Sequence, residues 1–152
     1  MFLGGVDNCI KSINLKKGQL DFGLFGHTDT VTGMQLSASG EYLLSNAMDN
    51  TVRMWDVRPF IESDVSRLKR VFLGGSHNFE RNLLRCGFGY NDKLVSAGSA
   101  DRVLYVWNAE TGEIKHRLGG HHGSLNDAQV HPTKQIVASG SSDKTILLGD
   151  LV

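Results

Sequence analysis

Residues 49–56, DNTVRMWD, decide the fold, because related copies of this stretch occur three more times in the chain. In each copy an aspartate follows small residues and precedes an apolar run, and a Trp, Ile or Gly followed by Asp or Asn stands six residues later. The copies begin at Asp7, Asp49, Asp101 and Asp143, with steps of 42, 52 and 42 residues. A recurring period of this length is the signature of a repeat protein, so we expect one structural unit to recur four times.

A glycine–histidine pair forms a second anchor upstream of the first. His27 stands 28 residues before Trp55, and His121 stands 28 residues before Gly149. In the third copy His77 takes this place, with two extra residues between it and the tryptophan. Eight more residues are inserted between the second copy and His77. We expect both insertions to lie in loops outside the repeated strands.

Short apolar runs bounded by turn-forming residues indicate β-strands. Three of these runs cover residues 31–36, 42–45 and 51–57. Residues 103–107 are apolar at every position, which is typical of strands that are covered on both faces. No helical periodicity persists, although residues 80–85 fit one helical turn. The sequence therefore predicts an all-β fold.

Composition excludes several classes of protein. The 152 residues suit one domain, and 16 Lys and Arg balance 16 Asp and Glu, so the broad basic surface of a nucleic-acid-binding protein is missing. Cys9 and Cys86 are too few and too far apart for a disulfide framework or a thiol-ligated zinc site, and they fit a reducing compartment. The chain has no long apolar run and starts without the features of an export signal, so we expect neither membrane anchoring nor export.

The two anchors, the aspartate six residues before the tryptophan and the 42-residue period resemble the WD-repeat family of β-propellers; residues 26–56 match nearly completely. The resemblance implies four-stranded blades, with each sequence repeat supplying the outer strand of one blade and three inner strands of the next. The chain then holds three, four, four and three strands, or about three and a half blades. The blade segments are expected at about residues 1–25, 26–74, 75–118 and 119–152.

Propeller rings close with about four to eight blades, so three and a half blades do not close one alone. We therefore expect the chain to be the C-terminal half of a seven-bladed ring. Uncovered blade faces and open strand edges would expose apolar surface, so the isolated chain is expected to self-associate.

His27, Ser45 and Asp49 are the residue types of a hydrolytic triad, but the family resemblance implies a structural tetrad. In this family the Trp55 N–H would donate to Ser45, Ser45 to His27, and His27 to Asp49. Such a network satisfies buried polar groups, each of which costs about 1 to 3 kcal/mol when unpaired. The corresponding residues of the other copies are His77, Asp101 and Trp107, and His121, Ser139 and Asp143. Ala97 and Gly149 replace the missing members, and partial loss argues against a catalytic set.

Two other kinds of site receive little support. A metal site would need His116, His121, His122 and His131 to converge, yet His121 belongs to a tetrad and the others fall in a strand or a turn. Residues 139–145 bring Gly, Lys and Thr close together, as phosphate-binding loops do, but they lack an adjacent Gly-Lys pair and a following helix. The sequence therefore predicts no cofactor, no metal and no catalytic residues.

One rim of the propeller is the main candidate for binding partners, because loops that join outer to inner strands and loops that carry the tetrad aspartates emerge there. The candidate residues are Thr28, Thr30, Met48, Asn50, Asn78, Phe79, Arg81, Arg102, Ser124, Ser142 and Lys144. Exposed apolar and arginine side chains are the types that form binding hot spots, and the alternative is that these are ordinary loop residues.

The insertion at residues 58–70 falls on the opposite rim and is the second candidate. It concentrates the cations Arg58, Arg67, Lys69 and Arg70, with Glu62 and Asp64 between them. A solvated loop and a docking site are both open interpretations.

Residues 43–60 and 77–86 resemble more specifically the branch of WD-repeat proteins that belongs to the U5 small nuclear ribonucleoprotein. This resemblance implies a non-enzymatic nuclear scaffold that acts in pre-mRNA splicing and binds protein subunits of that particle. A peptide-reading adaptor, such as the substrate receptor of a ubiquitin ligase, is the alternative. A propeller enzyme is a third possibility, for which the sequence offers no acid–base pair outside the tetrads.

Overall fold

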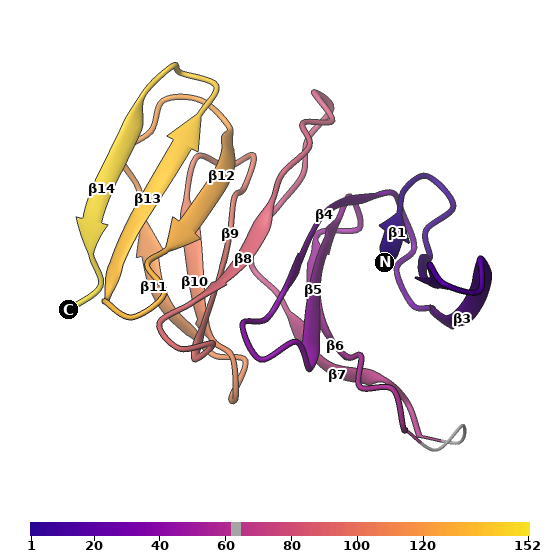
Figure 1. Ribbon diagram of the computed structural model, residues 1–152. Coiled ribbons are helices and arrows are strands. Elements are labelled where there is room, and N and C mark those ends of the chain that lie inside the picture. Colours follow the sequence, from indigo (N-terminus) through magenta and orange to yellow (C-terminus); the bar gives the residue numbers. More distant parts are fainter. Residues whose placement is uncertain (62–64) are drawn as a thin grey trace.

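The computed structural model describes residues 1–61 and 65–152, and these residues form strands and loops without a helix (Figure 1). The strands are β1 (Phe2–Gly4), β2 (Ile10–Asn14), β3 (Gln19–Leu24), β4 (Val31–Leu36), β5 (Tyr42–Ala47), β6 (Thr51–Asp56), β7 (Leu68–Phe72), β8 (Cys86–Gly89), β9 (Leu94–Ala97), β10 (Leu104–Asn108), β11 (Ile114–Leu118), β12 (Leu125–Val130), β13 (Ile136–Ser141) and β14 (Ile146–Asp150). The all-β prediction is confirmed.

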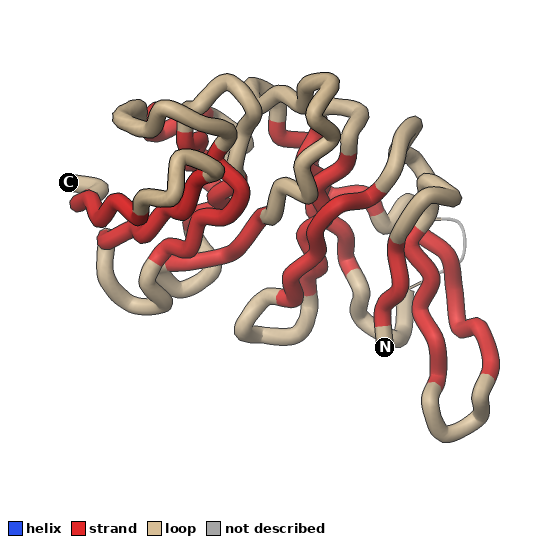
Figure 2. The backbone as a smooth tube through the Cα atoms, turned by 90° about the horizontal axis from the view of Figure 1, so that it is seen from above, coloured by secondary structure: helices blue, strands red, loops and turns tan. Residues whose placement is uncertain are grey.

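The strands form four antiparallel sheets in the orders β1-β2-β3, β4-β5-β6-β7, β8-β9-β10-β11 and β12-β13-β14. The expected series of three, four, four and three strands is therefore confirmed, and the architecture is that of a partial β-propeller. The sheets follow one another along an arc, as the view from above shows (Figure 2). Strands β4, β8 and β12 are the inner strands, since β8 contacts both of the others.

Close approach of the inner strands depends on Gly33 in β4. A Cβ atom at this position would lie 2.9 Å from the Cα of Arg85 and 3.0 Å from the carbonyl oxygen of Leu84. Because a glycine has no Cβ, the backbone that leads into β8 can pass directly against β4.

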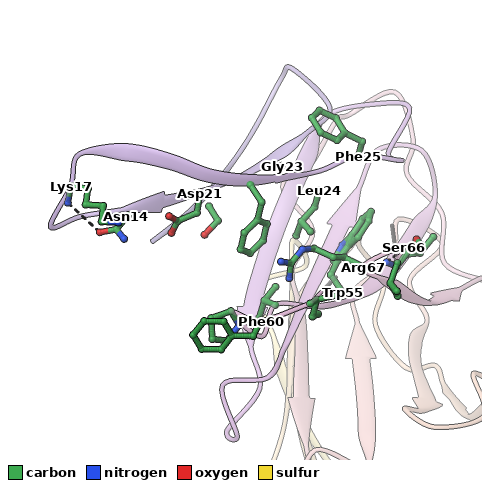
Figure 3. A pocket seen from close by; sticks show the side chains of 17 residues that line it. Asn14, Lys17, Asp21, Gly23, Leu24, Phe25, Trp55, Phe60, Ser66 and Arg67 are labelled. Carbon is green, nitrogen blue, oxygen red and sulfur yellow. Dashed lines mark hydrogen bonds between the residues drawn. The ribbon is translucent and has the colours of Figure 1, made fainter. Parts of the chain in front are cut away.

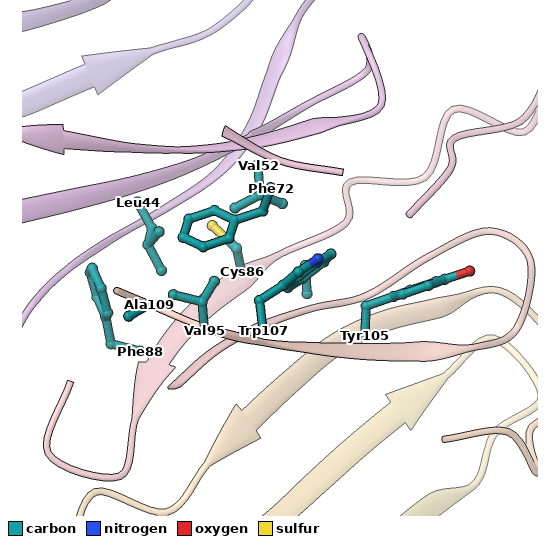
Figure 4. Close-up of a cluster of buried hydrophobic side chains, with 10 residues drawn as sticks. Leu44, Val52, Phe72, Cys86, Phe88, Val95, Tyr105, Trp107 and Ala109 are labelled. Atoms are coloured by element: carbon teal, nitrogen blue, oxygen red, sulfur yellow. The ribbon is translucent and has the colours of Figure 1, made fainter. Parts of the chain in front are cut away.

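The core consists of three apolar clusters, each lying between two consecutive sheets. Strand β10 shows why its sequence is apolar at every position. Tyr105 and Trp107 pack toward the β4–β7 sheet (Figure 4), whereas Leu104 and Val106 pack toward the β12–β14 sheet. Since alternate side chains of a strand point to opposite faces, both faces of this strand are buried.

Strand β14 carries a similar apolar run in a different environment. Ile146 and Leu148 are each 77% exposed, because no sheet formed by the described residues covers that face.

The interpretation of residues 80–85 as a helical turn is wrong. The backbone N–H of Arg81 donates to the carbonyl of Asn78 in a tight turn, and Arg81 has a φ of 51°, in the left-handed region. A right-handed helix cannot continue through this residue. In the described part of the chain, no helix is long and apolar enough to span a membrane.

Candidate functional site

The second repeat holds a complete hydrogen-bonded network between β5, β6 and the loop before β4. The Trp55 indole N–H donates to Ser45 Oγ at 2.8 Å, Ser45 Oγ lies 2.7 Å from His27 Nε2, and His27 Nδ1 lies 2.8 Å from Asp49 Oδ2. Because the carboxylate only accepts, His27 carries its proton on Nδ1 and Nε2 accepts from Ser45. Each polar atom thus has a partner of the required type.

Burial sets the charge states within this network. Desolvation lowers the pKa of His27 below its ordinary value, although its hydrogen bond to Asp49 opposes the shift. Burial raises the pKa of Asp49, but hydrogen bonds from the Thr51 hydroxyl, His27 and the Thr28 N–H outweigh it, so the net shift is downward. The network therefore joins a neutral histidine to an ionised aspartate.

The geometry gives Ser45 no access to a substrate. Its side chain is fully buried, and its oxygen accepts from Trp55 while donating to His27. A nucleophilic serine needs an exposed oxygen and room for a carbonyl carbon near 3 Å from it. The arrangement is suited to joining strands and not to acyl transfer.

The fourth repeat forms the same network without its tryptophan. His121 Nε2 lies 2.9 Å from Ser139 Oγ, and His121 Nδ1 lies 3.1 Å from Asp143 Oδ2. Gly149 stands at the tryptophan position, so no indole N–H reaches Ser139. The network of the fourth repeat therefore has one hydrogen-bond donor fewer than that of the second repeat.

In the third repeat the three remaining members of the set do not contact one another. Neither ring nitrogen of His77 has a hydrogen-bond partner, although both are buried. The Trp107 indole donates instead to the carbonyl of Leu73 at 2.9 Å, and Asp101 accepts from the Tyr105 hydroxyl at 2.7 Å. The assignment of His77, Asp101 and Trp107 to one network is therefore wrong.

Backbone conformation explains this failure. Gly26 and Gly120, which precede the two network histidines, have φ values of 149° and 132°, and the matching glycine of the third repeat is Gly74, with a φ of 129°. The residue after it is Gly75, so His77 is displaced two positions along the chain. Ala97 also supplies no hydroxyl to connect a histidine with the tryptophan.

Sequence reasoning missed one residue type in these networks. Thr51 Oγ1 donates to Asp49 Oδ1 at 2.7 Å, and Thr145 makes the equivalent contact with Asp143. The sequence does distinguish the copies, because the second and fourth repeats, which form a network, read Asp-x-Thr, whereas the third has Val103 at the threonine position.

The histidines outside the networks are not arranged around a common point. His131 lies in the turn between β12 and β13, where its Nδ1 accepts from the N–H groups of Thr133 and Lys134. His116 lies in β11, and His122 donates its backbone N–H to Asp143. Among the residues that the structure describes, no group of three or more His, Cys, Asp or Glu side chains could hold a metal ion.

The candidate partner-binding residues lie in loops at the rim that carries the network aspartates. Hydrogen bonds connect several of these loops: the His77 N–H donates to Asn50 Oδ1, the Met48 N–H to the Thr30 carbonyl, and the Ser142 N–H to the Ser124 carbonyl. The exposed members are Thr28, Asn50, Asn78, Phe79, Arg81, Arg102, Ser142 and Lys144. Thr30 is half-buried.

Besides Thr30, two members of this set are less accessible than expected. Met48 is half-buried in the β5–β6 turn, and Ser124 is 5% exposed. The Ser124 hydroxyl donates to Glu80 Oε2 at 2.9 Å, a role for both residues that sequence reasoning missed. Ser124 is therefore part of the structure beneath the rim surface.

The insertion leaves the opposite end of the β4–β7 sheet, at the bottom of Figure 1. Of its described residues, 68–70 belong to β7, so the expectation that the insertion lies wholly outside the strands is wrong. Two cations of the insertion lie close to the buried Asp56 carboxylate: Arg58 Nη2 is 2.6 Å and Lys69 Nζ 3.6 Å from Asp56 Oδ2. The Arg67 guanidinium stacks 3.8 Å above the ring of Phe22, and Arg70 Nη1 donates to the Thr111 carbonyl. Glu62 and Asp64 lie outside the described residues.

A cleft of about 930 Å³ separates this insertion from β3 (Figure 3). Phe22 and Leu24 of β3, Trp55 of β6, and Phe60 and Arg67 of the insertion line it. Phe60 is 98% exposed. Sequence reasoning missed this cleft because it depends on residues 59–61 and 65–68 lying opposite the first sheet.

Comparison with known proteins places these observations in a family. The model of the WD domain, G-beta repeat, matches residues 18–56, 70–108 and 112–150. The U5 small nuclear ribonucleoprotein 40 kDa protein of Homo sapiens is 49% identical over 148 residues, covering 97% of this chain and 41% of the relative. Pre-mRNA-splicing factor cwf17 of Schizosaccharomyces pombe is 44% identical over 151 residues, covering 99% of this chain and 44% of the relative. The chain thus spans less than half the length of either protein.

Proposed function

Since this chain belongs to the WD-repeat family, we propose that it is a non-enzymatic scaffold that binds proteins of the nuclear splicing machinery, within the U5 small nuclear ribonucleoprotein. The observation that carries this proposal is the identity of 49% to a U5 40 kDa protein across 97% of the chain. Similarity to a protein named as a pre-mRNA-splicing factor supports the same process.

The geometry supports a scaffold in a second way. Consecutive sheets are joined by continuous apolar clusters, which makes the blades a rigid support. Loops of several blades meet at one rim and can contact one or more partners at once. Function in such folds lies in the surface residues of the loops, and on this rim those are the exposed candidate residues.

Affinity purification tests the assignment to the splicing particle. The tagged protein, purified from nuclear extract of the organism that encodes it, is expected to enrich U5 small nuclear RNA over the other spliceosomal RNAs. The measurement is hybridisation of the bound RNA, with mass spectrometry of the bound proteins. Enrichment of ubiquitin-ligase core subunits without U5 RNA would replace the splicing assignment with that of a substrate-reading adaptor.

A serine-directed fluorophosphonate probe tests the non-enzymatic part. Ser45 is expected to remain unlabelled in the folded protein, because its oxygen is buried and bonded to Trp55 and His27. The Ser45→Ala variant is the matched control, since it lacks the only oxygen at issue. Labelling of the wild type that disappears in this variant would show a reactive serine and contradict the assignment.

A further inference from the structure

Residues 76–85, called here the rim loop, connect β7 to β8 and project from the rim at the top of Figure 1. Two large apolar side chains of this loop face solvent: Phe79 is 92% exposed and Leu83 is 66% exposed. Neither belongs to any of the three apolar clusters of the core. The fold therefore gains nothing from an apolar residue at either position.

The rim loop is attached to the β4–β7 sheet at both of its ends. The His77 N–H donates to Asn50 Oδ1 at 2.6 Å. The Leu84 carbonyl accepts from Thr32 Oγ1 at 2.8 Å and from Asn46 Nδ2 at 3.2 Å, and the Leu84 side chain is 1% exposed. These hydrogen bonds, together with the buried Leu84 side chain, hold the loop ends in place.

The same loop is attached to the β12–β14 sheet on its other side. The Arg85 N–H donates to the Asn126 carbonyl at 2.9 Å, and the Ser124 hydroxyl donates to Glu80 Oε2 at 2.9 Å. The rim loop thus bridges the β4–β7 and β12–β14 sheets, which lie on either side of the β8–β11 sheet.

Contacts inside the loop fix its tip. The Glu80 N–H donates to Asn78 Oδ1 at 3.0 Å, and Asn82 Nδ2 donates to Glu80 Oε2 at 2.9 Å. Arg81 adopts a left-handed backbone conformation between them. Because these bonds already restrict the backbone between Asn78 and Asn82, a partner that binds there has little ordering entropy to offset.

Around Phe79 the formal charges of Arg81, Arg102, Glu80 and Asp101 balance, but the carboxylates already accept hydrogen bonds whereas the two guanidinium groups are available to a partner. Glu80 uses its carboxylate on Ser124, Asn82 and Asn78, and Asp101 accepts from the Tyr105 hydroxyl and the Val103 N–H. In the described part of the chain, the exposed Arg81 and Arg102 form no ion pair within 4.0 Å. Exposed guanidinium groups on the same rim as two exposed apolar side chains complement an apolar segment that carries carboxylates.

We propose that the rim loop is a preformed docking element for an acidic protein segment, which covers Phe79 and Leu83 with apolar side chains and pairs carboxylates with Arg81 and Arg102. This inference rests on the proposed scaffold function and locates its contact. A protein is favoured over RNA because Leu83 offers no ring for stacking on a base, and because the chain has no net positive charge to attract a phosphate backbone.

Site-specific crosslinking tests the docking element. A photoreactive benzophenone amino acid is placed at position 79 of the tagged protein, or at position 60 as the control, since Phe60 is equally exposed on the opposite rim. Illumination in nuclear extract is expected to join position 79 to one protein, through a peptide that sequencing shows to contain both apolar and acidic residues. Arg81→Glu with Arg102→Glu is expected to reduce that crosslink about tenfold, whereas Lys115→Glu, an exposed charge on β11, leaves it unchanged.

Each other outcome overturns the docking element. These outcomes are equal crosslinking at positions 79 and 60, a ribonuclease-sensitive crosslink to RNA, a crosslink to a second copy of the chain, or a protein crosslink that does not respond to the arginine reversals. The proposed function is judged separately by the U5 RNA in the same purification. U5 RNA without a position-79 crosslink contradicts only the docking element, and an arginine-dependent crosslink without U5 RNA contradicts only the splicing assignment.

Discussion

The second and third repeats carry a histidine, an aspartate and a tryptophan in the same order, yet the two regions are stabilised differently. In the second repeat, the Trp55 indole N–H donates to a network that connects two strands and a loop. In the third, the Trp107 indole reaches only a backbone carbonyl and stacks on Tyr105 at 5.7 Å. The third repeat thus relies on aromatic packing where the second relies on buried polar bonds.

This difference shows that a repeat motif and its hydrogen bonds are separable. What determines the network is the position of the histidine directly after the left-handed glycine, together with a hydroxyl on the second strand of the sheet. The third repeat lacks both, and its longer loop bridges the neighbouring sheets instead. His77 therefore lies in the rim loop, which we propose binds a partner, and not in a hydrogen-bonded network.

The largest expected effect is the loss of the complete network. His27→Ala leaves Ser45 and Asp49 buried without their central partner, so we expect the free energy of unfolding to fall by about 1 to 3 kcal/mol. Chemical denaturation followed by tryptophan fluorescence measures this change. A loss no greater than that of the equivalent change at His77 would show that the network contributes nothing beyond packing.

A smaller loss is expected from His121→Ala in the fourth repeat. The two partners that lose the histidine are more exposed here: Ser139 is 7% exposed against 0% for Ser45, and the Asp143 side chain is 11% exposed against 4% for Asp49. Water can replace more of the lost hydrogen bonds, so we expect a cost of about 1 kcal/mol. The same denaturation measurement applies. If His121→Ala costs more than His27→Ala, the burial of the histidine's two partners does not account for the difference between the two networks.

Much of this fold follows from sequence because a period, an alternating pattern and turn residues are local properties. The all-β class and the burial of β10 on both faces could be read in this way, whereas the grouping of the strands into sheets and the partners of His27 followed from the resemblance to the WD-repeat family. The orphaned His77 could not, since its failure depends on which glycine adopts a positive φ. The bridging role of Glu80 and the cleft beside Phe60 depend on where loops fold, which no local pattern specifies.

Acid should weaken the fold through His27 and His77. Burial lowers the pKa of both His27 and His77, although Asp49 opposes the shift at each and Asp29 also opposes it at His77. The unfolded chain therefore binds more protons just below its ordinary histidine pKa of about 6.5, and stability falls as the pH decreases from 7 to 5. Denaturation across this range should show a shallower decline for His77→Gln, and an unchanged slope would contradict the burial of a neutral His77.

Removing the orphaned histidine should have a small effect at neutral pH. His77→Ala deletes ring packing but also removes two buried nitrogens that lack partners. These contributions oppose each other, so we expect the free energy of unfolding to stay within about 1 kcal/mol of the wild type. A loss comparable to that of His27→Ala would mean that the ring has polar partners after all.

The smallest expected effect tests whether the missing hydroxyl alone separates the two regions. Ala97 and His77 line the same small internal space, so the hydroxyl introduced by Ala97→Ser can reach the unpartnered imidazole. If it does, the substitution is close to neutral in the wild type and destabilising in the His77→Ala background, where a buried hydroxyl has no partner. A double-mutant cycle should then give a coupling energy of about 0.5 to 1 kcal/mol. Zero coupling would show that the displaced backbone after Gly74, and not the absent hydroxyl, prevents the network from forming in the third repeat.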